Sequence, residues 1–266
     1  MNLILKGFII GIGKIIPGIS GSALAIALGV YEDALKKISN IKDELKTKST
    51  YLIKLGIGII LAIMLTSKIV VKCLNKYYLS TILLFVGLII GELPRIIKQT
   101  KINKKEKILI LIITLLLTIF FFRISIKEHT LEKNMIEIFK LVGIGILDSI
   151  SSIIPGISGT ALLMSLGYYE IVLNTFSTIL SIDKIRTNLF VILPFTTGFI
   201  MGTIIISKII TYLFKNYKKQ TYIAVISFSL LSIILLLKRI DYKLIEIVKN
   251  IPFLIIGLII SRKIDK

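Results

Sequence analysis

The chain of 266 residues has no tryptophan, one cysteine and one histidine. The lone Cys73 excludes an internal disulfide, and together with the lone His129 it leaves no Cys/His metal cluster. Acidic residues are scarce, with 15 Asp and Glu against 34 Lys and Arg, which gives a formal net charge of +19. These absences argue against a disulfide-stabilised secreted domain, and we expect neither a resident metal nor a cofactor.

Hydrophobic residues, by contrast, make up 55% of the chain, and the mean hydropathy is +0.90. Soluble domains average about 45–50% apolar residues. The charged residues lie in short connectors between long apolar runs, which is typical of a polytopic helical membrane protein. We therefore expect a single membrane domain, 1–266, whose basic connectors contact lipid head groups and not nucleic acid.

A motif occurs twice in the chain, 138 residues apart. Ile15–Glu32 reads IIPGISGSALAIALGVYE and Ile153–Glu170 reads IIPGISGTALLMSLGYYE, with 13 of 18 positions identical. A weaker match follows at an offset of 140, where Gly58 corresponds to Gly198. The chain is therefore expected to consist of two repeats, 1–134 and 135–266.

Each repeat runs through an apolar segment into P-G-I-S-G, then through a short apolar segment, a polar connector and three longer apolar runs. Proline and glycine interrupt a helix at the motif. The flanking pieces, Asn2–Ile16 and Ser20–Tyr31 in the first repeat, are too short to span a membrane. Two alternatives follow: a re-entrant hairpin, or a discontinuous helix that crosses. The longer apolar runs are 51–71, 79–97, 108–122, 188–214, 221–237 and 244–260.

The two alternatives predict different topologies. Hairpins give three crossings per repeat and inverted repeats, whereas crossing helices give four crossings and parallel repeats. The hairpin topology divides the connector Lys and Arg 18 to 12 between the two sides, and the crossing topology divides them 17 to 13. The positive-inside rule thus favours an all-α membrane protein of two inverted repeats, each a re-entrant helix hairpin plus three transmembrane helices, with both termini cytoplasmic.

The broken helices at the two motifs are candidates for an anion site. A helix N-terminus offers unpaired amide groups and a partial positive charge, which suit a phosphate of about −1.5 to −2 charges. Transporters with inverted repeats place their substrates at such breaks. The alternative is that the glycines and serines only pack helices tightly. The candidate residues are Pro17, Gly18, Ser20, Gly21, Ser22, Pro155, Gly156, Ser158, Gly159 and Thr160.

Charged residues near the motifs are further candidates. Lys14 precedes the first motif, where a membrane-embedded lysine would serve as a phosphate counter-ion, and Ser152 stands at the corresponding position of the second repeat. Asp148 is a candidate proton or sodium site, while Glu32 and Glu170 are candidates for coupling proton movement. The sequence has no Ser-His-Asp, metal-ligand or phosphate-loop pattern, so we expect a transporter and not an enzyme.

At these residues the sequence resembles the bacterial polyprenyl-phosphate transporter family, formerly domain of unknown function 368. The resemblance rests on KGFIIGIGKIIPGISGSALAIALGVYE, SIIPGISGTALLMSLGYYE and the run Phe85–Pro94. It implies a flippase that returns undecaprenyl phosphate, the lipid carrier of cell-wall precursors, to the inner leaflet of the bacterial plasma membrane. It also implies that the residues of the doubled motif bind the lipid phosphate.

The architecture is also similar to that of the undecaprenyl-pyrophosphate phosphatase family, which brings glutamates and an arginine to its hairpin motifs. The two motifs here carry neither, so phosphatase chemistry lacks its base and its phosphate clamp. A membrane phosphatase, a small-anion channel or transporter and a structural scaffold stay as alternatives. The coupling ion and the oligomeric state are left open.

Overall fold

The computed structural model describes residues 2–17, 19, 21–40, 50–100, 102–123, 131–154, 159–238, 240 and 242–264. These residues form helices and no strand, so the expected all-α fold is confirmed. The first half contains α1 (Leu3–Ile15), α2 (Gly21–Ala27), α3 (Tyr31–Ser39), α5 (Tyr51–Lys76), α6 (Tyr78–Thr100) and α7 (Lys104–Arg123). The second contains α8 (Met135–Ile153), α9 (Gly159–Ser165), α10 (Tyr169–Ser177), the 3-10 turn η1 (Ile182–Lys184), α11 (Ile185–Asn216), α12 (Lys218–Lys238) and α13 (Leu244–Ile264).

Two of these helices lie where the sequence suggested polar connectors. α3 and α10 each begin at the tyrosine just before the final glutamate of the duplicated motif. In α3, Glu32 and Asp33 occupy the first turn while Lys36 and Lys37 occupy the last. This order of charges complements the helix dipole and favours a helix in a polar segment. The long apolar runs are confirmed as the helices α5, α6, α7, α11, α12 and α13.

The duplicated motif folds back on itself in both halves. Gly21, at the start of α2, lies beside the end of α1, and its added Cβ would be 3.4 Å from the carbonyl oxygen of Ile10. Beyond α2, the carbonyl of Leu28 accepts a hydrogen bond from Lys6 Nζ at 2.8 Å, near the start of α1. In the second half, Tyr168 follows α9 and donates to Glu137 Oε1 in the first turn of α8 at 3.1 Å. Each motif is therefore a helical hairpin.

Corresponding glycines allow the same close helix contact in both halves. A Cβ on Gly58 would lie 2.0 Å from the carbonyl oxygen of Ile4, and a Cβ on Gly198 would lie 2.0 Å from that of Val142. Any side chain at either position would collide with the backbone, so only glycine permits the approach of α1 to α5 and of α8 to α11. Since Ile4 and Val142 are 138 residues apart, the two halves pack in the same way.

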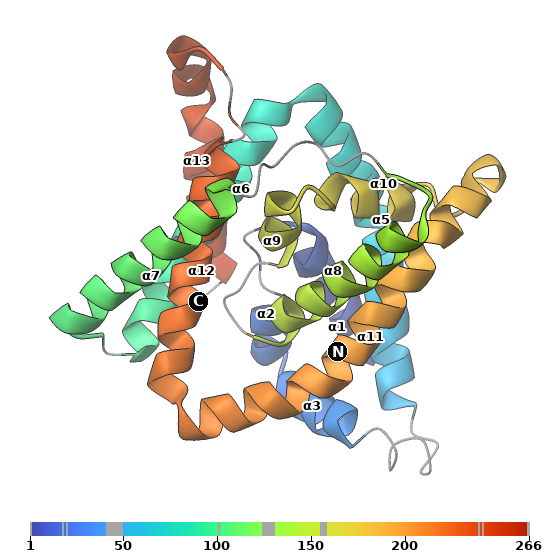
Figure 1. Cartoon of the computed structure of the whole chain (residues 1–266), viewed down its shortest axis with the longest axis horizontal. Coiled ribbons are helices and arrows are strands. Elements are labelled where there is room, and N and C mark those ends of the chain that lie inside the picture. The colour runs from blue at the N-terminus through green and yellow to red at the C-terminus, as the bar shows by residue number, and fades with distance from the viewer. Residues whose placement is uncertain are drawn as a thin grey trace.

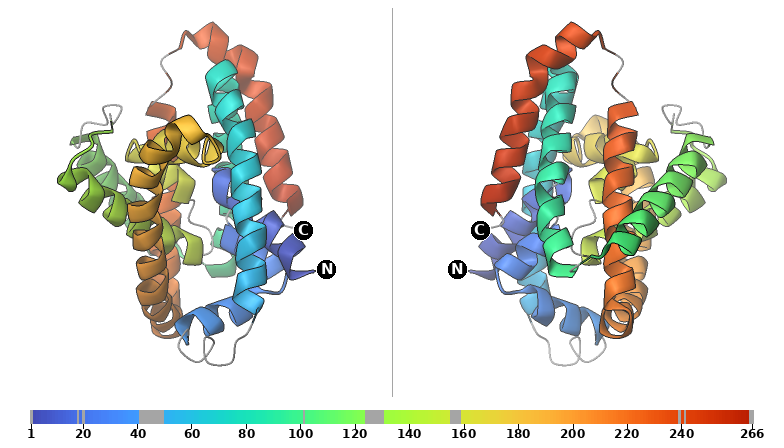
Figure 2. Two further views of the ribbon diagram at one scale, coloured as in Figure 1. Left: turned by 90° about the vertical axis from the view of Figure 1, so that its right-hand side faces the viewer. Right: turned by 90° about the vertical axis from the view of Figure 1, so that its left-hand side faces the viewer.

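The last helix of each half packs on the other half. α6 and α13 lie side by side (Figures 1 and 2) and run in the same direction, with Ser80 bonded to Asn250 and Gly91 further along against Ser261. α7 and α12 also run in the same direction: Glu106 pairs with Lys219 near their starts, and Thr114 contacts Ser227 further on. The two halves are therefore interlocked. The hairpin helices α1, α2, α8 and α9 occupy the centre of the view in Figure 1, with the long helices around them.

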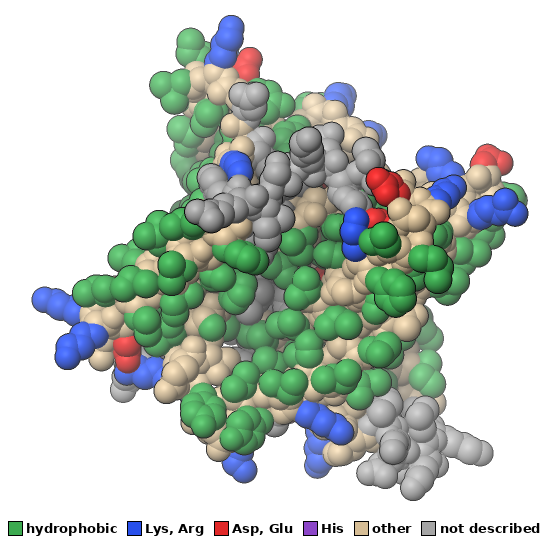
Figure 3. All heavy atoms as spheres, viewed as in Figure 1, with side chains coloured by type: hydrophobic (Ala, Val, Ile, Leu, Met, Phe, Trp, Pro, Cys, Tyr) green, Lys and Arg blue, Asp and Glu red, His purple; other side chains and the backbone are tan. Residues whose placement is uncertain are grey.

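The outer surface is apolar. Four helical segments within the described part of the chain are long and apolar enough to cross a membrane: Tyr51–Lys76, Ile182–Ile210, Lys218–Lys238 and Leu244–Lys263. Hydrophobic side chains are spread over the face seen in Figure 3, and most of its Lys and Arg side chains lie toward the outer edges. On α7 alone, Leu111, Leu115 and Leu116 are each at least 60% exposed. A water-soluble protein does not expose so much apolar surface, whereas a lipid-facing one must. The chain is a multi-pass membrane protein.

Candidate functional site

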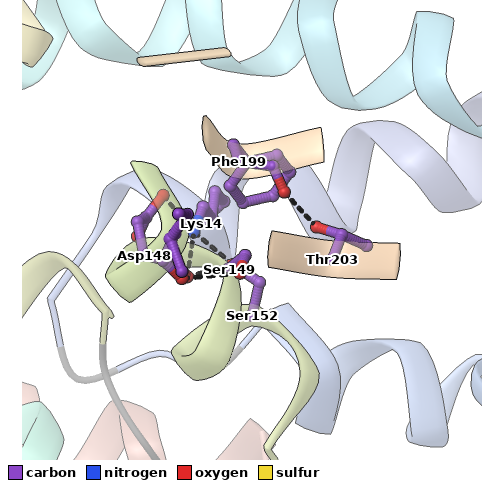
Figure 4. A network of polar contacts seen from close by, with 7 residues as sticks. Lys14, Asp148, Ser149, Ser152, Phe199 and Thr203 are labelled. Atoms are coloured by element: carbon purple, nitrogen blue, oxygen red, sulfur yellow. Dashed lines mark hydrogen bonds and ion pairs between the residues drawn. The ribbon is translucent and has the colours of Figure 1, made fainter. Parts of the chain in front are cut away.

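A buried ion pair joins the two hairpins. Lys14 lies in the last turn of α1, and its Nζ is 2.7 Å from Oδ2 of Asp148 on α8. The side chain of Asp148 is 2% exposed and that of Lys14 is 18% exposed. The same ammonium group also donates to the main-chain carbonyl of Asp148 and to Oγ of Ser152 (Figure 4). One lysine therefore makes several polar contacts with a single face of α8.

Helix α11 closes this cluster from another side. The ammonium group of Lys14 lies 5.0 Å from the centroid of the Phe199 ring, a cation–π distance. Ser152 Oγ donates to the carbonyl of Asp148 at 2.8 Å, and Thr203 Oγ1 donates to that of Phe199 at 2.6 Å. An ion pair withdrawn from water is held together strongly, but either charge is costly if its partner leaves. A competing charge that reaches the cluster would therefore strongly change the stability of the ion pair.

The lysine and the serine of this cluster are corresponding residues of the two repeats. Lys14 and Ser152 lie 138 residues apart, the offset of the duplicated motif, and their side chains touch. When two halves of a chain are related by a pseudo-twofold axis, corresponding residues meet only at that axis. The counterpart of Asp148 is the apolar Ile10, so each repeat contributes one charge to the pair.

Two tyrosines connect the hairpins in a reciprocal way. Tyr31 donates a hydrogen bond to the carbonyl oxygen of Ile153 at 2.7 Å, and Tyr169 donates one to that of Ile15 at 2.9 Å. Ile15 and Ile153 are the last residues of α1 and α8, where carbonyl groups lack the usual partner in the helix. Sequence reasoning did not single out these tyrosines, although both occur in the G-x-Y-E end of the duplicated motif.

The candidate residues from the sequence are divided between several places. Gly18, Ser20, Pro155, Gly156 and Ser158 lie outside the described residues. Pro17, Gly21, Ser22, Gly159 and Thr160 lie in the hairpins, where Ser22 is 3% and Thr160 is 5% exposed. Lys14 and Asp148, which the sequence suggested for different roles, are brought into direct contact.

The remaining acidic candidates are not part of this cluster. Glu32 and Glu170 are exposed in the first turns of α3 and α10, next to Tyr31 and Tyr169. Within the described ranges, no group of three His, Cys, Asp or Glu side chains is placed to hold a metal ion. The helices that follow the breaks, α2 and α9, have only seven residues each. The charges where the two hairpins meet are therefore carried by the side chains of Lys14 and Asp148 and not by a helix end.

Comparison with known proteins points to one family. Residues 10–247 match the family model described as undecaprenyl phosphate translocase-like. A polyprenyl-phosphate transporter of Staphylococcus aureus (strain NCTC 8325 / PS 47) is 30% identical over 266 residues, covering 97% of this chain and 93% of the relative. A polyprenyl-phosphate transporter of Vibrio cholerae serotype O1 (strain ATCC 39315 / El Tor Inaba N16961) is 27% identical over 236 residues, covering 83% and 72%. No solved structure matches the chain. The chain belongs to the undecaprenyl phosphate translocase-like family and is a membrane transporter, not an enzyme.

Proposed function

We propose that the chain moves a polyprenyl phosphate, such as undecaprenyl phosphate, between the leaflets of the bacterial plasma membrane. The observation that carries the proposal is Lys14, a cationic side chain held where the two hairpins meet. A charged head group needs a polar path through the membrane, and the hairpins offer one while the prenyl tail stays in lipid. The names of the two relatives support this class of substrate.

The second part of the proposal is that the two repeats are inverted in the membrane. The contact of Glu106 with Lys219 brings the α6–α7 and α11–α12 connections to one end of the molecule, and this hydrogen bond lowers the pKa of Glu106 below its usual range. Lys133 donates a hydrogen bond to Thr187, so the α7–α8 and α10–α11 connections also lie together. The hairpin topology assigns both of these connections to the opposite side of the membrane. Parallel repeats would place the members of each pair on opposite faces. These contacts support inverted repeats, and the positive-inside rule then assigns both termini to the cytoplasm.

The third part concerns how a phosphate reaches Lys14. The ammonium group is neutralised by Asp148, so a lipid phosphate must compete with this carboxylate. Uptake of a proton by Asp148 would remove the competing charge and leave Lys14 to the phosphate. We therefore propose Lys14 as the head-group ligand and Asp148 as the coupling residue, with a proton as the coupling ion. Glu32 and Glu170 are exposed, and for them we propose only a part in proton access.

The hairpin residues complete the proposed head-group site. Ser22 and Thr160 occupy corresponding positions and are both buried within the hairpins. Glycine has no side chain, so glycines at the breaks would let a head group approach the backbone. The proposed lining residues are Pro17, Gly18, Ser20, Gly21, Ser22, Pro155, Gly156, Ser158, Gly159 and Thr160.

A transport assay tests the proposal. Purified protein is reconstituted in liposomes that contain a fluorescent polyprenyl phosphate, and a membrane-impermeant quencher reports how fast the label changes leaflet. Native protein should make this exchange faster than in empty liposomes. Lys14→Met combined with Asp148→Asn should return the exchange rate to that of empty liposomes, and the double substitution leaves no buried unpaired charge. Lys68→Met is the matched control, because Lys68 is an exposed lysine in the middle of α5.

The same preparation separates the alternatives. Absence of exchange with native protein, or full exchange with the double variant, would overturn the proposed function. Release of inorganic phosphate from the pyrophosphate lipid would indicate a phosphatase. Ionic currents across a planar bilayer that need no lipid phosphate would indicate a channel.

A further inference from the structure

The two tyrosine contacts hold each hairpin to the broken end of the other. Tyr31 follows α2 and reaches the end of α8, while Tyr169 follows α9 and reaches the end of α1. Tyr31 and Tyr169 are corresponding residues, and so are their acceptors Ile153 and Ile15. The contacts are therefore two copies of one interaction across the pseudo-twofold axis.

The two contacts lie on opposite sides of the central ion pair. Tyr31 packs in a hydrophobic cluster with Leu3 and Tyr51, at the starts of α1 and α5. Tyr169 belongs to another cluster that includes Val70 and Leu74, near the other end of α5. Because α5 is a continuous helix of 26 residues, its ends are separated by about 39 Å, the thickness of a membrane. One tyrosine is thus nearer each face.

Each hydrogen bond is costly to break while its surroundings stay closed. The amide of Ile19, which would bond the carbonyl of Ile15 if the helix continued, is instead bonded to the carbonyl of Ile16. A buried carbonyl without a donor is unfavourable, and more so in a membrane than at a surface. If the contact opens together with the passage of water to the carbonyl, this cost disappears. Each tyrosine therefore stabilises the state in which the transporter is closed toward the membrane face nearer that tyrosine.

We propose that Tyr31 and Tyr169 are the two gates of the transport cycle, one for each face of the membrane. Opening toward the face of the N-terminus breaks the bond from Tyr31 to Ile153 and keeps the bond from Tyr169 to Ile15; opening toward the opposite face does the reverse. Both bonds are made here, so in this assignment both gates are closed. This assignment rests on the proposed function, since it assumes alternating access, and it makes both tyrosines positioning residues.

Face-specific labelling tests the assignment. A Cys73→Ser background removes the native cysteine, and Ser152→Cys places a thiol at the centre. Its reaction with a membrane-impermeant thiol reagent is measured from each side in vesicles of known orientation. Tyr31→Phe should raise the labelling rate about tenfold from the face of the N-terminus, as expected for loss of one hydrogen bond to a buried carbonyl, and Tyr169→Phe should do so from the opposite face.

Tyr168→Phe is the matched control. It also removes a buried tyrosine hydroxyl that makes a hydrogen bond, but the acceptor Glu137 lies in the same repeat. The labelling rate should therefore not rise from either face. Labelling that rises equally from both faces, or not at all, in both gate variants would overturn the gates even if lipid transport persists. Face-specific labelling without any movement of lipid phosphate would instead retain the gates and refute the proposed substrate.

Discussion

The side chains of Lys14 and Ser152 touch, although the two residues are 138 positions apart, the offset of the duplicated motif. In a symmetric dimer this position would hold either two lysines, which repel each other, or two serines, which carry no charge. In a single chain with an internal duplication, the two corresponding positions can carry different residues, because each half of the sequence can be substituted independently. The pairing of Lys14 with Asp148, whose counterpart is Ile10, depends on this freedom.

The ion pair predicts a strong coupling between its two residues. Lys14→Met leaves the carboxylate of Asp148 buried without its cation, which should lower the free energy of unfolding by about 3–5 kcal/mol. Lys14→Met combined with Asp148→Asn should cost less than the sum of the single variants. Denaturant unfolding in detergent micelles, arranged as a double-mutant cycle, measures the difference. Single variants that each cost less than about 1 kcal/mol would mean that water already reaches the pair.

The glycine contacts predict opposite effects at two glycines. Gly198→Ala brings a Cβ to 2.0 Å from the backbone of Val142, so α8 and α11 must separate, which should cost at least about 1–3 kcal/mol. Gly143→Ala is the control on α8, because nothing lies within 4 Å of its added Cβ. A helical glycine in open space should gain about 0.5–1 kcal/mol when it is replaced by alanine. Equal thermal stability of the two variants would contradict the packing.

The sequence predicted the helix breaks and the long apolar helices, since each follows from local patterns. Pro17 and the duplicated motif mark the break, but they do not say where the chain goes after it. The contacts between Lys14 and Asp148 and between Tyr31 and Ile153 join residues more than 120 positions apart, and no local pattern specifies them. The offset of 138 makes Lys14 and Ser152 corresponding residues. It does not by itself predict that they touch, because a contact also depends on how the two halves pack.

The proposed inverted topology predicts which connections share a face. Single cysteines in place of Glu106 and Lys219, in a Cys73→Ser background, should react with an impermeant maleimide from the same side of the membrane. Cysteines in place of Lys133 and Thr187 should react from the opposite side. Intact and inverted vesicles distinguish the two faces. Parallel repeats would instead split each pair between the faces, which would refute the topology.

Competition between Asp148 and the lipid phosphate predicts how one substitution changes the dependence of transport on protons. In Asp148→Asn the amide neither neutralises Lys14 nor takes up a proton, so the head group should bind more tightly. Transport by the native protein should respond to a pH gradient across the liposome, whereas transport by Asp148→Asn should not. Asp183→Asn is the matched control, because this exposed carboxylate lies in η1, outside the ion pair and outside the hairpins. If Asp148→Asn keeps the native response to the gradient, the proton is bound elsewhere; if it also keeps the native affinity, the phosphate does not compete at Lys14.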